Sequence, residues 1–232
     1  MLKGRKTDNF SMRIYLETIE SIVGSHGLKS VLNYIHLEKY IDNFPPSNDR
    51  VEIPLEDLQN LCRSLLELFG QKGIRSLQLR VGRQIMKRSI EKLPLLVKMI
   101  IPVRFLVPES KRMQVGLERL IKAIEKKYPS TSELQGPRLE LREEEDCFII
   151  IYRDNWESED VMSQSPVCSV AVGSVEAFVE WATGHAHEVT EVECRAMGDC
   201  ADVFRISKSC REEGEMIEKR SLDSPFPQKR YT

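Results

Sequence analysis

The sequence predicts an α+β fold, in which an antiparallel sheet of about four strands packs against helices and follows a helical N-terminal region. The first observation is that apolar residues before Pro129 recur at intervals of three and four, the spacing of one face of an α-helix. The second is that this period changes after Arg138, where apolar residues alternate with charged ones or run together as in β-strands.

Five segments of the first half are predicted to be helical, and small residues mark several of their ends. Ser11 is available to cap the start of the first segment, and Gly24 is placed to end it. Pro54 starts the third segment and Gly70 closes it, whereas Gly82 weakens the fourth. The five segments are 12–23, 31–35, 55–69, 74–90 and 113–128.

The second half is predicted to contain two β-hairpins with a helix between them. In the first hairpin, Leu139 and Leu141 alternate with charged neighbours, and an acidic turn at 144–146 leads into a β-rich run. The second hairpin turns at Gly198-Asp199. The predicted strands are 139–141, 147–152, 188–194 and 203–206, and the helix is 173–181.

The most apolar run of the chain, 93–107, is too short to span a bilayer and is interrupted by Lys98, Arg104 and two prolines. We therefore expect buried core there and no membrane span. The basic N-terminus is followed by no apolar signal segment, so we expect a reducing, cytoplasmic location.

A formal net charge of -2 gives the chain no general attraction for nucleic acid, so a nucleic-acid partner is not expected. The basic residues between Arg75 and Arg88 form one local cluster, but no aromatic residues that could stack on bases are interleaved with them. We interpret this cluster as a solvated helix face.

Six cysteines in a reducing compartment suggest metal binding or burial rather than disulfides. Cys168 precedes a predicted helix, Glu191 and Cys194 lie three residues apart on a predicted strand, and Cys200 and Asp202 follow the next turn. Thiolates and carboxylates can together bind a tetrahedral zinc ion. By spacing alone, these residues are explained equally well by a metal site and by an arrangement without metal, in which the thiols are buried apolar side chains and the carboxylates lie on a strand face or in a turn. Cys62 and Cys147 lie in apolar patterns and are predicted to be core, and Cys210 is predicted to be a free tail thiol.

The second half also resembles a known family. The segments that carry the resemblance are Pro166-Val167-Cys168, Gly173, Glu191-Val192-Glu193-Cys194, Gly198-Asp199 and Phe204. They are similar to the 4-vinyl reductase domain, a hydrocarbon-binding module that is also the sensor of phenol- and toluene-responsive transcriptional activators. The resemblance extends over roughly residues 138–208.

The resemblance implies a structural zinc site whose first three ligands fall on Cys168, Glu191 and Cys194. The family's fourth ligand is a cysteine, but its position in this chain holds Asp202. Either Asp202 binds through oxygen, or Cys200 substitutes from two residues earlier on the same strand face, or no metal binds. His185 and His187 flank the strand as further alternatives.

The resemblance further implies the α+β fold of transport-protein-particle subunits, which are commonly homodimers, and a cavity for an apolar molecule between helices and sheet. The change of period at Pro129 and the polar composition after Ser209 divide the chain into a mainly helical region 1–128, a core 129–208 and a flexible tail 209–232. The resemblance implies that the core binds ligand and metal, and the helical region either packs on the same core or forms a separate lobe. Apolar and aromatic residues near the expected cavity form its candidate lining. They are Phe105, Met113, Leu117, Phe148, Ile150, Phe178 and Trp181.

These implications predict a cytosolic binding or sensing protein that encloses a hydrophobic or aromatic ligand and uses zinc as a structural element. A closed four-ligand site leaves no open position for water, which argues against hydrolytic catalysis. One alternative is an enzyme or accessory protein of tetrapyrrole metabolism, although no dinucleotide-binding GxGxxG follows a strand. Another is a scaffold without a ligand.

Overall fold

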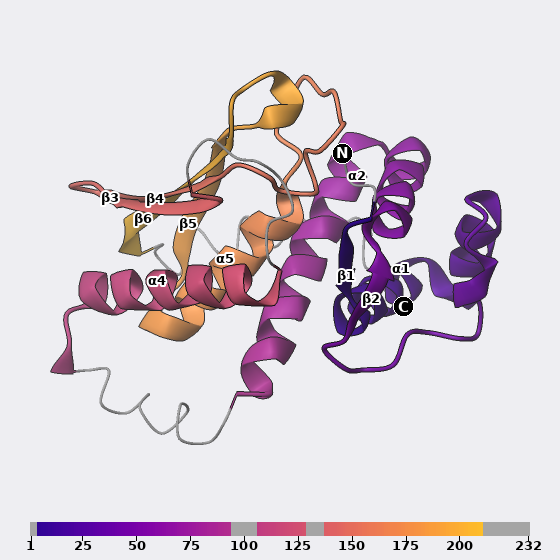
Figure 1. The fold of residues 1–232 in the computed structure, drawn as a ribbon, viewed down its shortest axis with the longest axis horizontal. Coiled ribbons are helices and arrows are strands. Elements are labelled where there is room, and N and C mark those ends of the chain that lie inside the picture. The colour runs from indigo at the N-terminus through magenta and orange to yellow at the C-terminus, as the bar shows by residue number, and fades with distance from the viewer. Residues whose placement is uncertain (1–3, 94–105, 129–136, 211–232) are drawn as a thin grey trace, which may run out of the picture.

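A computed structural model of the chain describes residues 4–93, 106–128 and 137–210. The long helix α2 (Leu55–Glu91) runs through the middle of the molecule (Figure 1). The β-sheet lies on one side of it with the helices α4 (Glu109–Lys127) and α5 (Ser169–Thr183). On the other side lies α1 (Asn9–Tyr34) with the short strands β1 (Lys6–Asp8) and β2 (Val51–Pro54). The predicted α+β fold is confirmed.

The sheet has four strands in the order β3, β4, β6, β5, and every neighbouring pair is antiparallel. Both predicted hairpins are present, the first closed at its turn by the Glu144 N–H, which donates to the Cys147 carbonyl at 2.9 Å. In the second, a short 3-10 helix, η3 (Arg195–Met197), joins the strands. The strands are β3 (Leu139–Glu143), β4 (Cys147–Tyr152), β5 (His187–Glu193) and β6 (Asp202–Cys210).

Each of the two long helices combines two predicted segments across a glycine. Gly24 in α1 has φ 76° and Gly70 in α2 has φ 66°, so the backbone leaves the helical conformation at both positions and then resumes it. A residue with a side chain is strained at such angles, whereas glycine is not. The two predicted ends are therefore breaks within longer helical stretches.

The first helix is capped by Asp8 and not, as predicted, by Ser11. An Asp8 carboxylate oxygen accepts the Ser11 backbone N–H at 2.9 Å, and the Ser11 hydroxyl donates to the other oxygen at 2.8 Å. The chain enters the helix three residues earlier than the apolar spacing indicated, because the carboxylate supplies the acceptor that the first turn needs.

The helix α2 continues through Gly82, and this glycine allows α2 and α5 to cross at backbone contact. A Cβ atom on Gly82 would lie 2.1 Å from the Val170 carbonyl oxygen, and one on Gly173 would lie 2.2 Å from the Leu79 carbonyl oxygen. Both distances are far inside van der Waals contact, so the crossing requires glycine on both helices.

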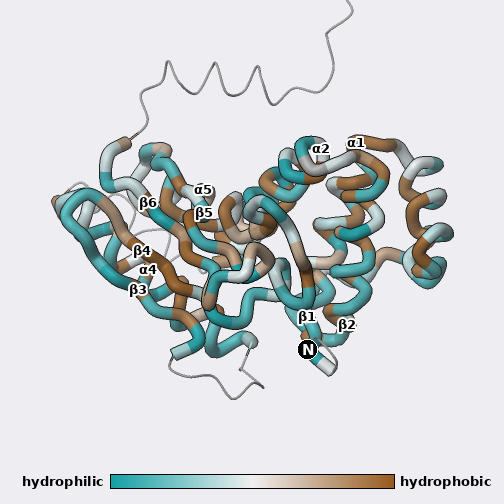
Figure 2. Tube along the Cα trace, turned by 90° about the horizontal axis from the view of Figure 1, so that it is seen from above, coloured by the Kyte–Doolittle hydropathy of each residue, from teal (hydrophilic) through white to brown (hydrophobic). Residues whose placement is uncertain are grey.

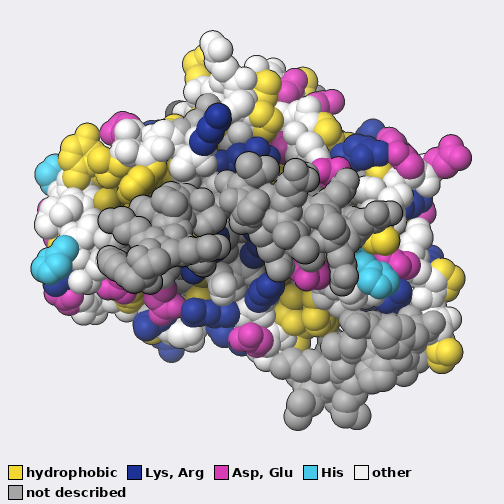
Figure 3. Space-filling model, turned by 180° about the vertical axis from the view of Figure 1, so that it is seen from behind, with side chains coloured by type: hydrophobic (Ala, Val, Ile, Leu, Met, Phe, Trp, Pro, Cys, Tyr) yellow, Lys and Arg dark blue, Asp and Glu magenta, His cyan; other side chains and the backbone are white. Residues whose placement is uncertain are grey.

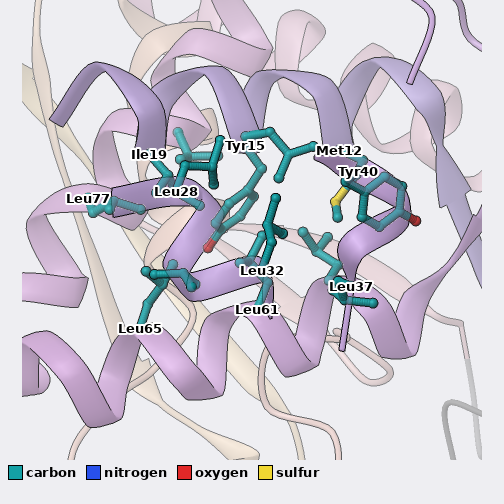
Figure 4. Packing of buried hydrophobic residues seen from close by; sticks show 14 of the residues in the cluster. Met12, Tyr15, Ile19, Leu28, Leu32, Leu37, Tyr40, Leu61, Leu65 and Leu77 are labelled. Atoms are coloured by element: carbon teal, nitrogen blue, oxygen red, sulfur yellow. The ribbon is translucent and has the colours of Figure 1, made fainter. Parts of the chain in front are cut away.

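Two large apolar clusters form most of the core, one on each side of α2, and a third, small cluster contains Ile151, Ala201 and Val203. The first joins α1 to the N-terminal part of α2 and includes Met12, Tyr15 and Leu61 (Figure 4). The second lies between the sheet and the helices α4 and α5, and its buried members include Phe204 and Ile206 of β6. Apolar stretches occur both in the part with the sheet and in the part with α1 (Figure 2).

The cysteines outside the candidate metal site are placed mostly as expected. Cys147 is fully buried in β4 and Cys62 is half-buried against the first cluster. Cys210 is exposed, but it is the last residue of β6 rather than part of a tail, because the strand continues along β5 to pair Cys210 with His187. The rest of the predicted tail lies outside the described residues.

The charged surface is mixed in sign. On the face seen from behind, Lys and Arg side chains lie among Asp and Glu side chains over the described part (Figure 3). Within the basic cluster of α2, Arg83 binds Glu176 and Arg88 binds Glu17, each at 2.7 Å. Among the described residues, no helix is long and apolar enough to cross a membrane.

Candidate ligand cavity and metal site

A cavity of about 1050 Å³ lies between α2, α4, α5 and the inner face of the sheet. This volume is at the upper end of the range of small-molecule sites in proteins. Most of its wall is apolar. The apolar lining includes Leu58, Ile85, Met86, Ile90, Leu120, Ile124, Leu139, Ile150, Val175, Phe178, Trp181 and Phe204.

Three of the seven residues predicted to line a cavity lie on this wall: Ile150 on β4 and Phe178 and Trp181 on α5. The rings of Phe178 and Trp181 are neighbours, with centroids 5.7 Å apart. The wall therefore offers an aromatic pair for stacking on a flat or apolar ligand.

Met113, Leu117 and Phe148 do not line the cavity. Each is 0 % exposed and packs in the core between the sheet and the helices. On α4 the stripe that contains Met113 and Leu117 faces this core, while Gly116 and Leu120 face the cavity. Helical spacing finds the buried side of a helix but does not separate a packed face from one that borders a cavity. Phe105 lies outside the described residues.

Charged residues are unevenly distributed around the cavity. One acidic residue, Glu157, lines its described part together with seven basic residues. The seven are Arg5, Lys6, Lys111, Arg112, Arg119, Lys127 and Arg138. Sequence periodicity could not reveal this asymmetry, since the residues come from the chain segment before α1, from α4 and from the start of the sheet.

Next to the cavity, four potential metal ligands converge at the start of α5. The ligand atoms of Cys168, Glu191, Cys194 and Asp202 all lie within 4.8 Å of one another. Cys168 is the N-cap residue of α5, and Glu191 lies on β5. Cys194 directly follows β5 and Asp202 begins β6. The group thus joins one helix start to two neighbouring strands.

Hydrogen bonds hold the carboxylates of this group in place. Glu191 Oε2 accepts the Cys168 backbone N–H at 2.9 Å. Asp202 accepts the Ser158 hydroxyl at 2.6 Å and the Arg195 backbone N–H at 2.8 Å, one bond on each oxygen. Each bond uses one lone pair of its acceptor oxygen, so a lone pair remains on each for a metal.

Burial raises the pKa values of Cys168, Glu191 and Asp202 above their usual ranges, because charged forms lose their hydration there. In addition, Glu191 Oε1 is buried and accepts no hydrogen bond from the described residues. Because uncompensated charge is costly in a buried site, the two thiols and two carboxyls are either protonated or neutralised by a bound divalent cation. The donor set therefore fits zinc.

The remaining candidate ligands lie elsewhere. Cys200 is exposed and is not part of the group, because it precedes β6 on the surface turn. His187 Nε2 contacts Glu109 Oε1 at 2.8 Å, and His185 Nδ1 contacts the same carboxylate at 3.1 Å. Both imidazoles thus belong to the attachment of α4 and not to the cysteine site.

Glu157 was not predicted as a functional residue. Its carboxylate accepts the Val170 and Ala171 backbone N–H groups at 2.7 and 2.9 Å, so it caps α5 from a distant loop. Burial raises its pKa to about 8. It was one of several acidic residues in a polar stretch, and nothing in the local pattern distinguished it.

No protein-family model matches the chain, and no curated protein matches it significantly. Solved structures do match. The Fe(II) unliganded H-NOX protein from K. algicida has a TM-score of 0.55 at 11% identity, covering 88% of this chain and 97% of that one. An H-NOX variant from T. tengcongensis has a TM-score of 0.54 at 17% identity, covering 85% and 96%.

A third similar structure is the phenol-responsive sensory domain of the transcription activator PoxR, solved with phenol. Its TM-score is 0.51 at 17% identity, covering 77% of this chain and 86% of that one. None of these three structures is named as a 4-vinyl reductase. At such identities the similarity concerns the fold alone.

Proposed function

We propose that this protein binds and senses a small hydrophobic or aromatic molecule, which it encloses between α2, α4, α5 and the sheet. The observation that carries the proposal is the large, mainly apolar cavity with Phe178 and Trp181 on its wall. The similarity of the fold to a domain solved with phenol supports it. A protein that served only as a scaffold would gain stability by filling this space with side chains.

The test is to identify what the protein carries. Native mass spectrometry of the purified chain, followed by extraction, is expected to reveal an apolar molecule in stoichiometric amount. Ile85→Trp, which places a large side chain on the cavity wall, is expected to reduce this occupancy at least about fivefold. Leu68→Trp on the same helix is the matched control, because Leu68 is exposed and does not line the cavity.

Equal occupancy in the wild type and in Ile85→Trp would place the bound molecule elsewhere and contradict the proposal.

The same preparation addresses the alternative of tetrapyrrole metabolism, since a bound tetrapyrrole would absorb visible light. No histidine or cysteine lines the described part of the cavity, whereas haem iron is usually held by one of them. We therefore favour a ligand without iron.

We also propose that zinc occupies the group of Cys168, Glu191, Cys194 and Asp202 in a structural role. The bound ion would neutralise the buried thiolates and carboxylates and fasten the start of α5 to β5 and β6. The orphaned Glu191 Oε1 and the two thiols within 4.8 Å support this assignment. A homodimer and a cytoplasmic location, which the family resemblance and the sequence suggest, complete the proposal.

Cys194→Ser tests the zinc proposal. The variant is expected to lose zinc, measured by elemental analysis, and to unfold at a lower temperature, because a metal that binds only the folded chain adds to its stability. Loss of about 3 kcal/mol would lower the melting temperature by roughly 10 °C in a chain of this size. Unchanged zinc content and unchanged melting temperature would together reject the site.

A further inference from the structure

One corner of the cavity is built around two arginines and one aspartate. Arg138, Arg5 and Tyr152 line the cavity there, and Asp154 lies behind them. Arg138 Nε donates to Asp154 Oδ1 at 2.5 Å, and an Arg5 nitrogen lies 3.7 Å from Asp154 Oδ2. Arg5 also donates to the Asp154 backbone carbonyl at 3.0 Å. The carboxylate thus fixes both guanidinium groups at the cavity wall.

The charges of this corner do not balance. The side chains of Arg5, Arg138 and Asp154 are only 13 %, 7 % and 5 % exposed, so water screens them poorly. Two guanidinium groups face one carboxylate, and among the described residues neither arginine has a second acidic partner. One net positive charge is therefore left at the end of an apolar cavity, which is costly unless an anion binds there.

Arg138 also has hydrogen-bonding capacity to spare. Its other contacts are to the Tyr128 carbonyl and to the Tyr152 hydroxyl oxygen, the latter at 3.0 Å. Three of its five N–H groups are thus used within the described residues, which leaves two for a planar acceptor. A guanidinium fork of this kind matches a carboxylate in bidentate geometry.

Tyr152 adds a third donor. Its oxygen accepts from Arg138, and its own O–H meets no acceptor among the described residues. Burial raises the pKa of Tyr152 to about 12, so the hydroxyl keeps its proton at neutral pH. The corner consequently presents donors and positive charge, and a ligand group that accepts hydrogen bonds complements it best.

We infer that the ligand is an amphipathic monoanion: an apolar body held by the cavity wall and a carboxylate head bound by Arg5, Arg138 and Tyr152. The inference rests on the proposed function, because it specifies the head group of the molecule that the cavity encloses. The single excess charge matches one carboxylate. The remaining basic residues at the cavity, among them Lys6 and Arg119, add a positive field that favours the same sign of ligand.

The experiment compares octanoate with 1-octanol, which share an apolar body and differ in the head. Isothermal titration of the full chain is expected to show at least about tenfold tighter binding of octanoate. Tryptophan emission gives a second readout, because both tryptophans of the chain, Trp156 and Trp181, line the cavity.

Arg5→Met is the decisive variant, since it removes the excess charge and leaves the Arg138–Asp154 pair intact. The variant is expected to lower the affinity for octanoate to within about twofold of the affinity for 1-octanol, and to leave the affinity for 1-octanol unchanged. Arg142→Met is the matched control. Arg142 is exposed on β3, pairs with Glu140 and does not line the cavity, so the preference for octanoate is expected to persist.

Tyr152→Phe provides an independent variant if Arg5→Met lowers the melting temperature. It keeps the ring and removes one donor, so a loss of about threefold in octanoate affinity alone is expected. Equal binding of octanoate and 1-octanol by the wild type would overturn the inference but leave the proposed function standing. If neither octanoate nor 1-octanol binds, the result counts against both the inference and the proposed function.

Discussion

At the scale of single residues, Asp202 distinguishes this chain from the zinc-containing pattern that it resembles. Its carboxylate lies in the group with Cys168, whereas Cys200 is exposed. Asp202→Ala is therefore expected to abolish stoichiometric zinc binding, and Cys200→Ala is expected to leave it unchanged. Elemental analysis of both variants checks this.

A third variant separates ligation from folding. Asp202→Cys supplies a thiolate at the same position, so zinc is expected to be retained even though the bonds from Ser158 and Arg195 are weakened. In the cobalt-substituted protein, the thiolate charge-transfer band should then be stronger than in the wild type. Loss of metal in Asp202→Cys together with retention in Asp202→Ala would contradict this arrangement.

Asp8 is a residue whose contribution depends on pH. Burial opposes its ionisation, but the Tyr128 hydroxyl, Lys127 and Ser11 outweigh burial and lower the pKa of Asp8 below 3.8. A lowered pKa means that the ionised carboxylate stabilises the fold above pH 3.8 and that this contribution is lost as the pH falls through the folded-state value.

Asp8→Ala is accordingly expected to lower the free energy of unfolding by roughly 1–3 kcal/mol at pH 7, with the difference from wild type shrinking below pH 3.8. Urea titrations at several pH values measure it. Asp49→Ala is the control, because Asp49 is mostly exposed and its ion pairs with Lys92 and Lys127 are long. If the difference in free energy of unfolding between wild type and Asp8→Ala did not vary with pH, the charge of the Asp8 carboxylate would not contribute to stability.

At the scale of elements, the crossing of α2 and α5 depends on Gly82 and Gly173. Gly82→Ala is expected to destabilise the protein by about 2–4 kcal/mol, because the new methyl group meets the Val170 carbonyl, which cannot rotate away. Thermal unfolding measures it. Gly73→Ala in the same helix is the control, since its nearest contact is the Phe69 side chain and a gain in helix propensity offsets a small adjustment.

At the scale of the whole molecule, the proposed metal site and the cavity share α5. The helix begins at Cys168 and carries Val175, Phe178 and Trp181 on the cavity wall. Removal of zinc with a chelator is therefore expected to weaken octanoate binding at least about threefold, and added zinc is expected to restore it. Titration calorimetry before and after chelation checks this. Unchanged affinity in metal-free protein would show that packing alone positions α5.

Much of the fold could be predicted because period and turn residues are local signals. The sequence predicts the four strands and the interruptions of the helices at Gly24 and Gly70. It also identifies Cys168 and Glu191 as candidate metal ligands. The cavity wall was not, since Met113 and Leu120 lie on one amphipathic helix and only packing decides which borders empty space. Likewise, Asp202 and Cys200 have the same strand parity, so alternation could not choose between them.

The glycine contact between α2 and α5 also limits how the cavity can change. Where two backbones touch, no side chain remains to be shortened or enlarged, so the spacing of these two walls is set by the main chain at Gly82 and Gly173. Redesign toward bulkier or slimmer guests therefore has to change side chains that line the cavity, such as Ile85, Leu120 and Ile150, and not the spacing of these two helices.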